Sequence, residues 1–218
     1  MPQTRRTENV EYPKIETLFK RDEKTHKVHP DKLRNPLYGI IKTWQFTEKI
    51  DGTNIRVMWT DGKLRIGGRT DKASLPADLV QLLYETIDAQ KMRETFGDNP
   101  AIIYGEGYGA GIQKGSGYSR TKQLVVFDVL VDGKWWLNRQ NVYGIATKLG
   151  LKTVPFMGEM DLDEAVTVVR GGLISLLAQR QGQTSETIPA EGLVGRTVEP
   201  LFDKHGNRLI IKLKTKDF

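Results

Sequence analysis

Alternating apolar and polar residues that meet at Asp-Gly pairs constrain this chain more than any other feature. The run WQFTEKIDGTNIRVMWTDGKLRIGGRT, residues 44–70, holds two strand-like segments separated by Asp61-Gly62. A second pair, Asp132-Gly133, ends the strand-like run KQLVVFDVLV. Asp-Gly suits the two-residue turns whose twist matches that of paired antiparallel strands. We therefore expect hairpins and mainly antiparallel sheets, and a doubly wound parallel sheet fits less well.

Helical signals lie between these strands. Leucines and an isoleucine recur at helical spacing from Leu79 to Ile87, and Gly97 stands beyond the end of that segment. Asn138 can cap a short helix that stops near Gly150. Asp161 can cap another helix, with a glutamate three residues later to complete a capping box.

The two ends of the chain differ in pattern. Residues 1–36 are polar and contain Pro13, Pro30 and Pro36, which predicts an irregular, partly helical lead-in. Residues 191–218 predict a strand, a turn at 205–207 and a second strand. The whole pattern predicts an α+β fold of mainly antiparallel sheets flanked by helices. With no repeat and no flexible linker in 218 residues, we expect a single domain over residues 1–218.

Composition excludes several classes of protein. The chain has no cysteine, so it can form neither a disulfide nor a thiolate nucleophile. No apolar run approaches the roughly 20 residues that a membrane helix needs, and the start lacks the apolar stretch of a secretory signal. We expect a cytoplasmic protein with no membrane partner. The net charge of +6 favours a polyanionic partner such as nucleic acid, although solubility explains it equally well.

Lys49 stands in the stretch EKIDGTN, two residues before Asp51 and three before Gly52. In a strand these two charged side chains share one face until the glycine disturbs the backbone. Lys49 is either a surface lysine beside a turn or a nucleophile, and a lysine is nucleophilic only when neutral. Nearby cations favour the neutral form, and Lys212 and Lys214, two apart in IIKLK, can supply them from one strand face.

Four further positions suit phosphate and nucleotide chemistry, although each is common in isolation. Arg69 follows two glycines and offers a planar fork for a phosphate or a ribose. Glu106 lies between two glycines at a strand end, and Glu191 precedes another strand, so either carboxylate can accept from a ribose or bind hydrated Mg²⁺. Phe127 lies in an apolar run, where it is a core residue or a ring that stacks on a base.

The order and spacing of these segments are specific. Lys49-Ile-Asp-Gly, Gly68-Arg69, Tyr104-Gly-Glu106, Phe127-Asp128, Glu191-Gly192 and Lys212-Leu-Lys214 resemble the motif series of covalent nucleotidyltransferases. That superfamily comprises DNA ligases, RNA ligases and mRNA capping enzymes. The sequences KIDGTN, GGRT, EGLVGR and KLKTKDF look most like the RNA ligases, especially those of phages that seal nicked duplex RNA. The resemblance runs from about Glu48 to Lys214. Because four residues follow Lys214, we expect this chain to lack the OB-fold or helical domain that follows this module in relatives.

The resemblance implies a role for each matched residue. Lys49 would attack the α-phosphate of ATP and become lysyl-AMP, while Lys212 and Lys214 would contact that phosphate and favour the neutral amine. Six residues would bind the nucleotide: Glu48, Arg56, Arg69, Glu106, Phe127 and Glu191. Among them, Phe127 would stack on adenine and Glu48 would contribute to the base pocket. Arg56 would lie near the AMP or the incoming 5′-phosphate. Glu191, with Asp51 nearby, would bind Mg²⁺ or Mn²⁺.

The resemblance thus implies an ATP-dependent RNA ligase that joins 5′-phosphate and 3′-hydroxyl RNA ends. We expect a monomer, with a partner protein as one source of the missing RNA-gripping domain. Two alternatives stay open within the enzyme class: a minimal ATP-dependent DNA ligase and a GTP-using capping guanylyltransferase. A catalytically inactive RNA-binding relic is the alternative from another class.

Overall fold

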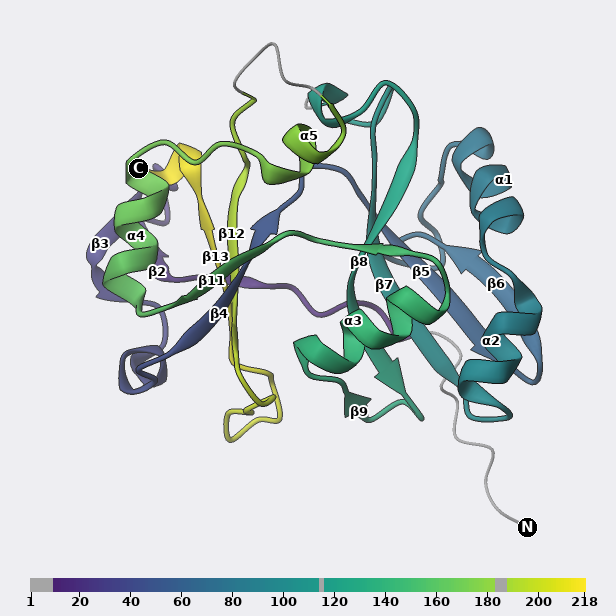
Figure 1. Ribbon diagram of the computed structural model, residues 1–218. Helices are drawn as coiled ribbons and strands as arrows, with labels where there is room; N and C mark the ends of the chain where they lie inside the picture. Colours follow the sequence, from purple (N-terminus) through teal and green to yellow (C-terminus); the bar gives the residue numbers. More distant parts are fainter. Residues whose placement is uncertain (1–9, 114–115, 183–187) are drawn as a thin grey trace. The chain divides into compact units, whose positions relative to one another are not determined.

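A computed structural model describes residues 10–113, 116–182 and 188–218 of the chain (Figure 1). Contacts divide the chain into two compact units. Unit 1 comprises Met1–Pro13 and Asp51–Thr153, and unit 2 comprises Lys14–Ile50 and Val154–Phe218. Within the described residues, no helix is long and apolar enough to cross a membrane.

Unit 1 is built on a six-stranded sheet in the order β10-β8-β7-β5-β6, with β9 paired to β8. Only the β10–β8 pair is parallel. The Asp61-Gly62 turn joins β5 to β6 as the sequence predicts, since both residues have positive φ and the flanking strands pair. The elements are β5 (Thr53–Thr60), β6 (Lys63–Gly67), α1 (Ala77–Thr86), α2 (Ala89–Phe96), β7 (Ala101–Tyr108), η2 (Ser116–Tyr118), β8 (Gln123–Val131), β9 (Trp135–Trp136), α3 (Arg139–Lys148) and β10 (Lys152–Thr153).

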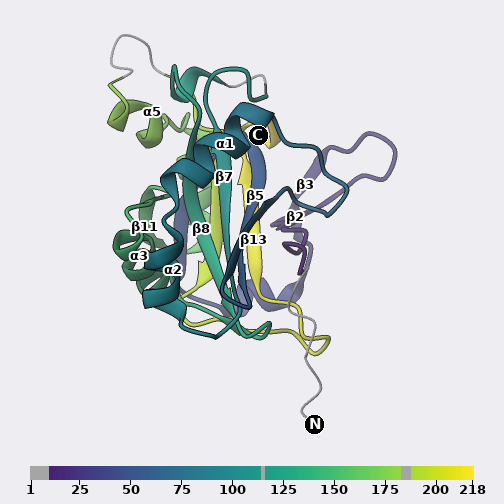
Figure 2. The same cartoon turned by 90° about the vertical axis from the view of Figure 1, so that its right-hand side faces the viewer.

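The two faces of this sheet differ in chemistry. One face packs against α1, α2 and α3 through a core that includes Ile55, Val57, Trp59, Leu79, Leu83, Met92, Phe96, Ile103, Val126 and Val142. Figure 2 shows the helices α1 and α2 on this side. Because side chains alternate along a strand, Asn54 and Arg56 point to the opposite face. In register with them on β7 lie Glu106 and Tyr104, so these four residues share what we call the polar face of unit 1.

Unit 2 holds a five-stranded sheet in the order β1-β13-β12-β4-β11 and a separate two-stranded sheet, β2-β3. Its core lies between the larger sheet and α4 and includes Trp44, Phe46, Ala165, Val169, Leu193, Ile211 and Leu213. The elements are β1 (Glu16–Thr17), β2 (Phe19–Arg21), β3 (Val28–Leu33), η1 (Pro36–Ile40), β4 (Trp44–Lys49), β11 (Phe156–Met160), α4 (Leu162–Arg170), α5 (Leu176–Arg180), β12 (Gly192–Thr197), β13 (Ile210–Lys214) and η3 (Thr215–Asp217).

The mixed α+β class and its mainly antiparallel sheets are confirmed. The predicted helix caps are confirmed too: Asn138 accepts a hydrogen bond from the Asn141 amide, and Asp161 and Glu164 form a capping box. The two predicted strands of the tail are β12 and β13.

Two sequence predictions were wrong. The segment predicted as one helix before Gly97 forms two helices, α1 and α2. The backbone is extended at Ile87, and the Asp88 side chain caps α2 by accepting a hydrogen bond from the Gln90 amide. The described part of residues 1–36 contains β1, β2 and β3 in place of an irregular, partly helical lead-in. β1 pairs in parallel with β13 from the far end of the chain, and such a long-range pairing leaves no local pattern in the sequence.

Candidate active site

Unit 2 brings three predicted residues into direct contact. Lys49 ends β4, Lys214 ends β13, and Gly192 at the start of β12 pairs in register with both. Glu191, immediately before Gly192, therefore lies between the two lysines. Its Oε2 is 2.5 Å from the Lys49 Nζ, and its Oε1 is 2.6 Å from the Lys214 Nζ.

Gly192 allows this close arrangement. Its φ of +148° lies in a region that L side chains rarely adopt, and an added Cβ would stand 1.9 Å from the Leu213 carbonyl oxygen. The Glu-Gly pair of the sequence thus has a steric explanation: the glycine lets the backbone approach β13 closely enough for Glu191 to reach Lys214.

Lys212 completes what we call the lysine cluster: Lys49, Lys212, Lys214 and Glu191. Lys212 and Lys214 lie two apart on β13 and so share one face of the strand. Burial lowers the pKa of Lys212, and the like charges of Lys214 and Lys49 lower it further. Three lysines against one carboxylate leave a positive site suited to an anion with several charges.

Glu191 is held ionised by its neighbours. Burial alone raises the pKa of Glu191, but the attraction of Lys49 and the hydrogen bond from Lys214 outweigh burial and leave that pKa below its usual value. The Lys49 Nζ is engaged in this ion pair. Attack by Lys49 on a phosphate therefore requires its Nζ to leave Glu191.

Glu48 is almost fully buried beside the cluster on β4, at 1% exposure. Its Oε1 accepts from the Ser175 hydroxyl, and its Oε2 accepts from the Leu177 amide at 2.9 Å. Burial raises the pKa of Glu48, and these hydrogen bonds oppose that shift. Both carboxylate oxygens of Glu48 thus bind the start of α5. The sequence assigned Glu48 to a base pocket and did not predict this contact.

The other five predicted residues lie in unit 1. Gly52, which follows Asp51, has no room for a side chain, because a Cβ would lie 2.2 Å from the Gly107 carbonyl oxygen on β7. The Asp51 amide donates to the Tyr118 hydroxyl at 3.4 Å. The DG of KIDG therefore serves close packing between the start of β5 and β7.

Arg56 is buried in the middle of β5, with 1% of its side chain exposed. Its Nε donates to the Gly68 carbonyl at 2.6 Å, and its Nη2 pairs with Asp71 at 2.7 Å. Arg56 thereby fixes the loop that carries Arg69, whose own side chain is exposed. The remaining nitrogen, Nη1, is buried and has no hydrogen-bond partner among the described residues.

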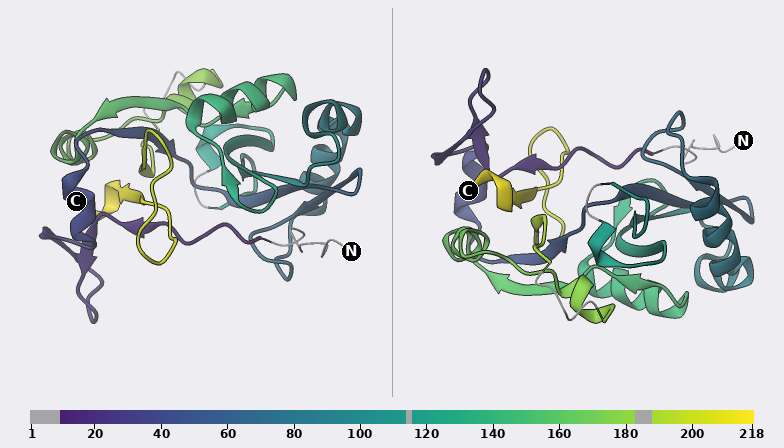
Figure 3. Two further views of the ribbon diagram at one scale, coloured as in Figure 1. Left: turned by 90° about the horizontal axis from the view of Figure 1, so that it is seen from below. Right: turned by 90° about the horizontal axis from the view of Figure 1, so that it is seen from above.

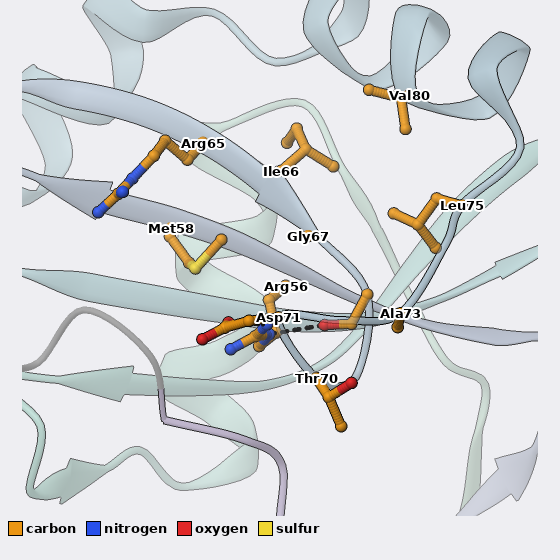
Figure 4. Close-up of a pocket in the computed structure, with 11 residues that line it drawn as sticks. Arg56, Met58, Arg65, Ile66, Gly67, Thr70, Asp71, Ala73, Leu75 and Val80 are labelled. Atoms are coloured by element: carbon orange, nitrogen blue, oxygen red, sulfur yellow. Dashed lines mark hydrogen bonds and ion pairs between the residues drawn. The ribbon is translucent and has the colours of Figure 1, made fainter.

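A pocket of about 450 Å³ lies at this edge of the sheet, lined by Arg56, Gly68, Thr70 and Asp71 together with aliphatic side chains such as Met58 and Leu75 (Figure 4). Figure 4 shows the Arg56 guanidinium between Asp71 and the loop. The residues that line this pocket include no aromatic ring.

Glu106 and Phe127 also lie on the sheet of unit 1. Glu106 is half-buried opposite Asn54, whose side-chain Oδ1 is buried with no partner among the described residues. Sequence reasoning did not assign a role to Asn54, although its spacing of two from Arg56 places both on the polar face. Phe127 is the extra residue of a β-bulge between β7 and β8, and its ring lies edge-on to Tyr12 at 4.9 Å.

A divalent metal fits this residue set only in a limited way. Among the described residues, no group of three or more Asp, Glu or His side chains could hold a metal ion. One carboxylate, Glu191, suits an Mg²⁺ or Mn²⁺ ion whose other ligands are water and the phosphates of a bound nucleotide. The chain therefore fits a metal that accompanies a phosphate substrate better than a resident metal.

Comparisons with known proteins agree with the motif series. A model of the RNA ligase family matches residues 42–214. Solved structures of an RNA ligase from Naegleria gruberi share the fold. A variant bound to ATP and manganese superposes with a TM-score of 0.65 at 16% identity, over 94% of this chain and 56% of that one.

The same Naegleria protein with pyrophosphate gives a TM-score of 0.62 at 19% identity, over 94% of this chain and 58% of that one. A second variant of that ligase, with ATP and manganese, gives a TM-score of 0.63 at 18% identity, over 95% of this chain and 64% of that one. The chain thus spans less than two thirds of the length of these proteins, and at such identities the likeness shows the fold.

Proposed function

Because the chain belongs to the RNA ligase family, we propose that it is the adenylating catalytic module of an ATP-dependent RNA ligase. The observation that carries the proposal is the lysine cluster, in which Glu191 contacts both Lys49 and Lys214. Lys49 is the nucleophile, and Lys212 and Lys214 bind the phosphate that it attacks. The family match over residues 42–214 and the ATP bound to the Naegleria ligase support ATP as the nucleotide.

In the first step, the Lys49 Nζ attacks the α-phosphorus of ATP. A P–N bond forms, the P–O bond to the β-phosphate breaks, and pyrophosphate leaves with the electron pair. Lys212 and Lys214 offset the negative charge that develops on the phosphate oxygens, which lowers the barrier.

Glu191 has two successive partners in this scheme. In the free chain its Oε2 is paired with the Lys49 Nζ. With nucleotide present, Glu191 would hold hydrated Mg²⁺ or Mn²⁺, which supplies positive charge to the phosphates when bound. Lys49 would then lose its ion pair and could give up its proton. Asp51 is proposed as a second, weaker contributor to that metal site.

The next two steps transfer the nucleotide and seal the strand. An oxygen of an RNA 5′-phosphate attacks the AMP phosphorus, the P–N bond breaks, and the Lys49 amine is regenerated. A 3′-hydroxyl then attacks the RNA phosphorus and releases AMP. Arg56, Arg69, Glu106 and Phe127 are proposed to bind the nucleotide, and the buried Nη1 of Arg56 supports a phosphate or ribose contact on the polar face.

We further propose that residues 1–218 act as one adenylation domain. Cytoplasmic residence, a monomeric state and a partner protein that grips RNA stay predictions of the sequence.

The test is covalent labelling from ATP labelled at the α-phosphate, read on a denaturing gel. The intact chain should retain label with ATP and a divalent metal, and Lys49→Arg should retain none. Arginine keeps the positive charge beside Glu191 but cannot become a neutral nucleophile. Lys152→Arg, at an exposed lysine of unit 1, is the matched control and should label normally.

Other outcomes separate the alternatives. Label from GTP and not from ATP would indicate a capping guanylyltransferase, and no label from either nucleotide would indicate an inactive relic. A labelled Lys49→Arg variant would show that the nucleophile is misassigned. Sealing of nicked duplexes made of RNA, DNA and both hybrids distinguishes an RNA ligase from a minimal DNA ligase.

A further inference from the structure

The two-stranded sheet formed by β2 and β3 has no assigned role. We call residues 19–34, which comprise this sheet, its turn and Arg34, the basic ribbon. They lie outside residues 42–214, so the family match says nothing about them. Figure 3 shows the ribbon extending away from the larger sheet of unit 2, and Figure 2 shows the same projection from the side. An isolated two-stranded hairpin is at best marginally stable in water, so other contacts must hold it.

Three sets of contacts order the ribbon. Phe19 and Leu33 pair in register and pack against the core of unit 2. Arg21 forms an ion pair with Asp217 and donates from Nη1 to the His26 carbonyl at 2.7 Å. Asp22 accepts hydrogen bonds from the amides of residues 24 and 25 and so closes the turn. The ribbon is therefore a built element.

The charge that remains free on the ribbon is positive. It contains six lysines and arginines against three acidic residues, which gives a net +3 of the +6 of the whole chain. Asp22 is occupied in the turn, and hydrogen bonds from Thr25 lower its pKa. Arg21 and Arg34 are paired with acidic residues outside the ribbon. Four exposed lysines have no ion-pair partner among the described residues: Lys20, Lys24, Lys27 and Lys32. Two exposed acidic residues, Glu23 and Asp31, are likewise unpaired there, so the free side chains of the ribbon leave a net +2.

Geometry directs part of this charge outward. Lys20 follows Phe19 and Lys32 precedes Leu33, and both lysines are exposed, whereas Phe19 and Leu33 are partly buried against the core of unit 2. No Phe, Tyr or Trp lies between residues 20 and 32, and the rings of this segment are those of His26 and His29. A segment with four exposed lysines and no large aromatic ring suits contacts to backbone phosphates, which carry no sequence information.

The base of the ribbon is attached to the strand of the lysine cluster. Thr17, two residues before Phe19, pairs in register with Lys212. Asp217, which holds Arg21, lies three residues after Lys214. A strand of nucleic acid bound along the ribbon would therefore be held beside β13 within unit 2.

We propose that the basic ribbon binds backbone phosphates of the RNA substrate, independently of sequence, through Lys20, Lys24, Lys27 and Lys32. The proposal rests on the proposed function for its choice of RNA. It gives the chain a grip on RNA of its own, in the role that the sequence assigned to a partner protein.

The experiment compares two variants of the full chain with equal charge change. One carries Gln at Lys20, Lys24, Lys27 and Lys32. The control carries Gln at four exposed lysines elsewhere, which are Lys91, Lys148, Lys152 and Lys204. Binding to a nicked duplex RNA is measured at a series of salt concentrations, and label retained from ATP is measured on the same samples. Circular dichroism verifies that both variants are folded.

The ribbon variant should bind RNA about tenfold more weakly or worse, and its slope of log K against log salt should become shallower by roughly three, because each lost phosphate contact removes almost one unit. The control should change affinity by less than about twofold. Both variants should label from ATP like the parent chain, since none of the eight lysines belongs to the lysine cluster.

Two results would overturn the proposal: an unchanged slope in the ribbon variant, or an equal loss in both variants, which would reduce the effect to net charge. Neither result affects the proposed function, because labelling reports it separately. Conversely, a parent chain that fails to label removes the proposed function, while the difference in RNA affinity between the two variants still decides the role of the ribbon.

Discussion

The lysine cluster of unit 2 and the region around Arg56 in unit 1 differ in whether their polar atoms have partners. In the lysine cluster, both oxygens of Glu191 are occupied by ammonium groups of the chain itself. On the polar face of unit 1, Arg56 Nη1 and Asn54 Oδ1 are buried with no partner among the described residues. The first site is closed on itself and must rearrange to act. The second already presents a free donor and a free acceptor.

The difference follows from the side chains used. A lysine ammonium is a point charge on a flexible stem and can change partner at little cost. An arginine guanidinium is a planar fork, so once Nε and Nη2 are fixed by Gly68 and Asp71, the direction of Nη1 is fixed as well. The charges in the lysine cluster of unit 2 can therefore change partners, whereas the guanidinium of Arg56 in unit 1 is held in one orientation.

The largest effect should come from Arg56→Met. The loss leaves the buried Gly68 carbonyl without its donor and the loop to Asp71 without its anchor, at a cost of about 3 kcal/mol in the free energy of unfolding. Urea unfolding followed by tryptophan fluorescence measures it. Arg65→Met, at an exposed arginine of the same pocket, is the matched control and should cost less than about 0.5 kcal/mol. Equal losses would mean that burial of Arg56 is not what stabilises the loop.

A smaller, pH-dependent effect should come from Glu191→Gln. At pH 7 we expect a loss of about 1–2 kcal/mol, because Lys49 and Lys214 then repel each other without a carboxylate between them. Since the pKa of Glu191 is lowered in the folded chain, its contribution is fully present above the ordinary value of 4.5 and is lost as the pH falls through the lowered pKa.

Thermal unfolding of the parent chain and of Glu191→Gln between pH 3 and pH 7 checks this sign, and the two curves should converge toward the acid end. Glu23→Gln, at an exposed carboxylate of the ribbon, is the control and should give parallel curves. A gap that widens as the pH falls would contradict the closed ion-pair arrangement.

The smallest effect should come from Asp71→Asn. The Asp71 side chain is 53% exposed, so its ion pair with Arg56 is screened by water and should contribute less than about 1 kcal/mol. The amide oxygen of Asn can still accept from Arg56. A loss as large as that of Arg56→Met would show that the pair, and not the Gly68 carbonyl, anchors the loop.

Local sequence signals predicted the elements that form from short-range contacts. The Asp61-Gly62 hairpin, the Asn138 cap and the Asp161–Glu164 capping box depend on residues within a few positions of each other. The basic ribbon and β1 were missed for the opposite reason. β1 is ordered by pairing with β13, and the ribbon is ordered by the packing of Phe19 and Leu33 on the core of unit 2 and by the ion pair between Arg21 and Asp217. The sequence around Pro30 shows no alternation typical of a strand. Pro30 is tolerated there because a two-stranded ribbon has only edge strands.

By itself, the sequence determined the α+β class and the membership in a motif-bearing family, since composition and spacing are properties of the chain alone. The roles of the matched residues stay predictions. Tertiary structure decided what those residues do in the free chain. Only the joint register of β4, β12 and β13 places Glu191 between Lys49 and Lys214, and only the packing of the 68–71 loop leaves Arg56 with one unused nitrogen. The distances of 2.5–2.6 Å from Glu191 to the two lysine Nζ atoms depend on strand register and on Gly192, where no side chain fits. No single segment of the sequence reveals either condition.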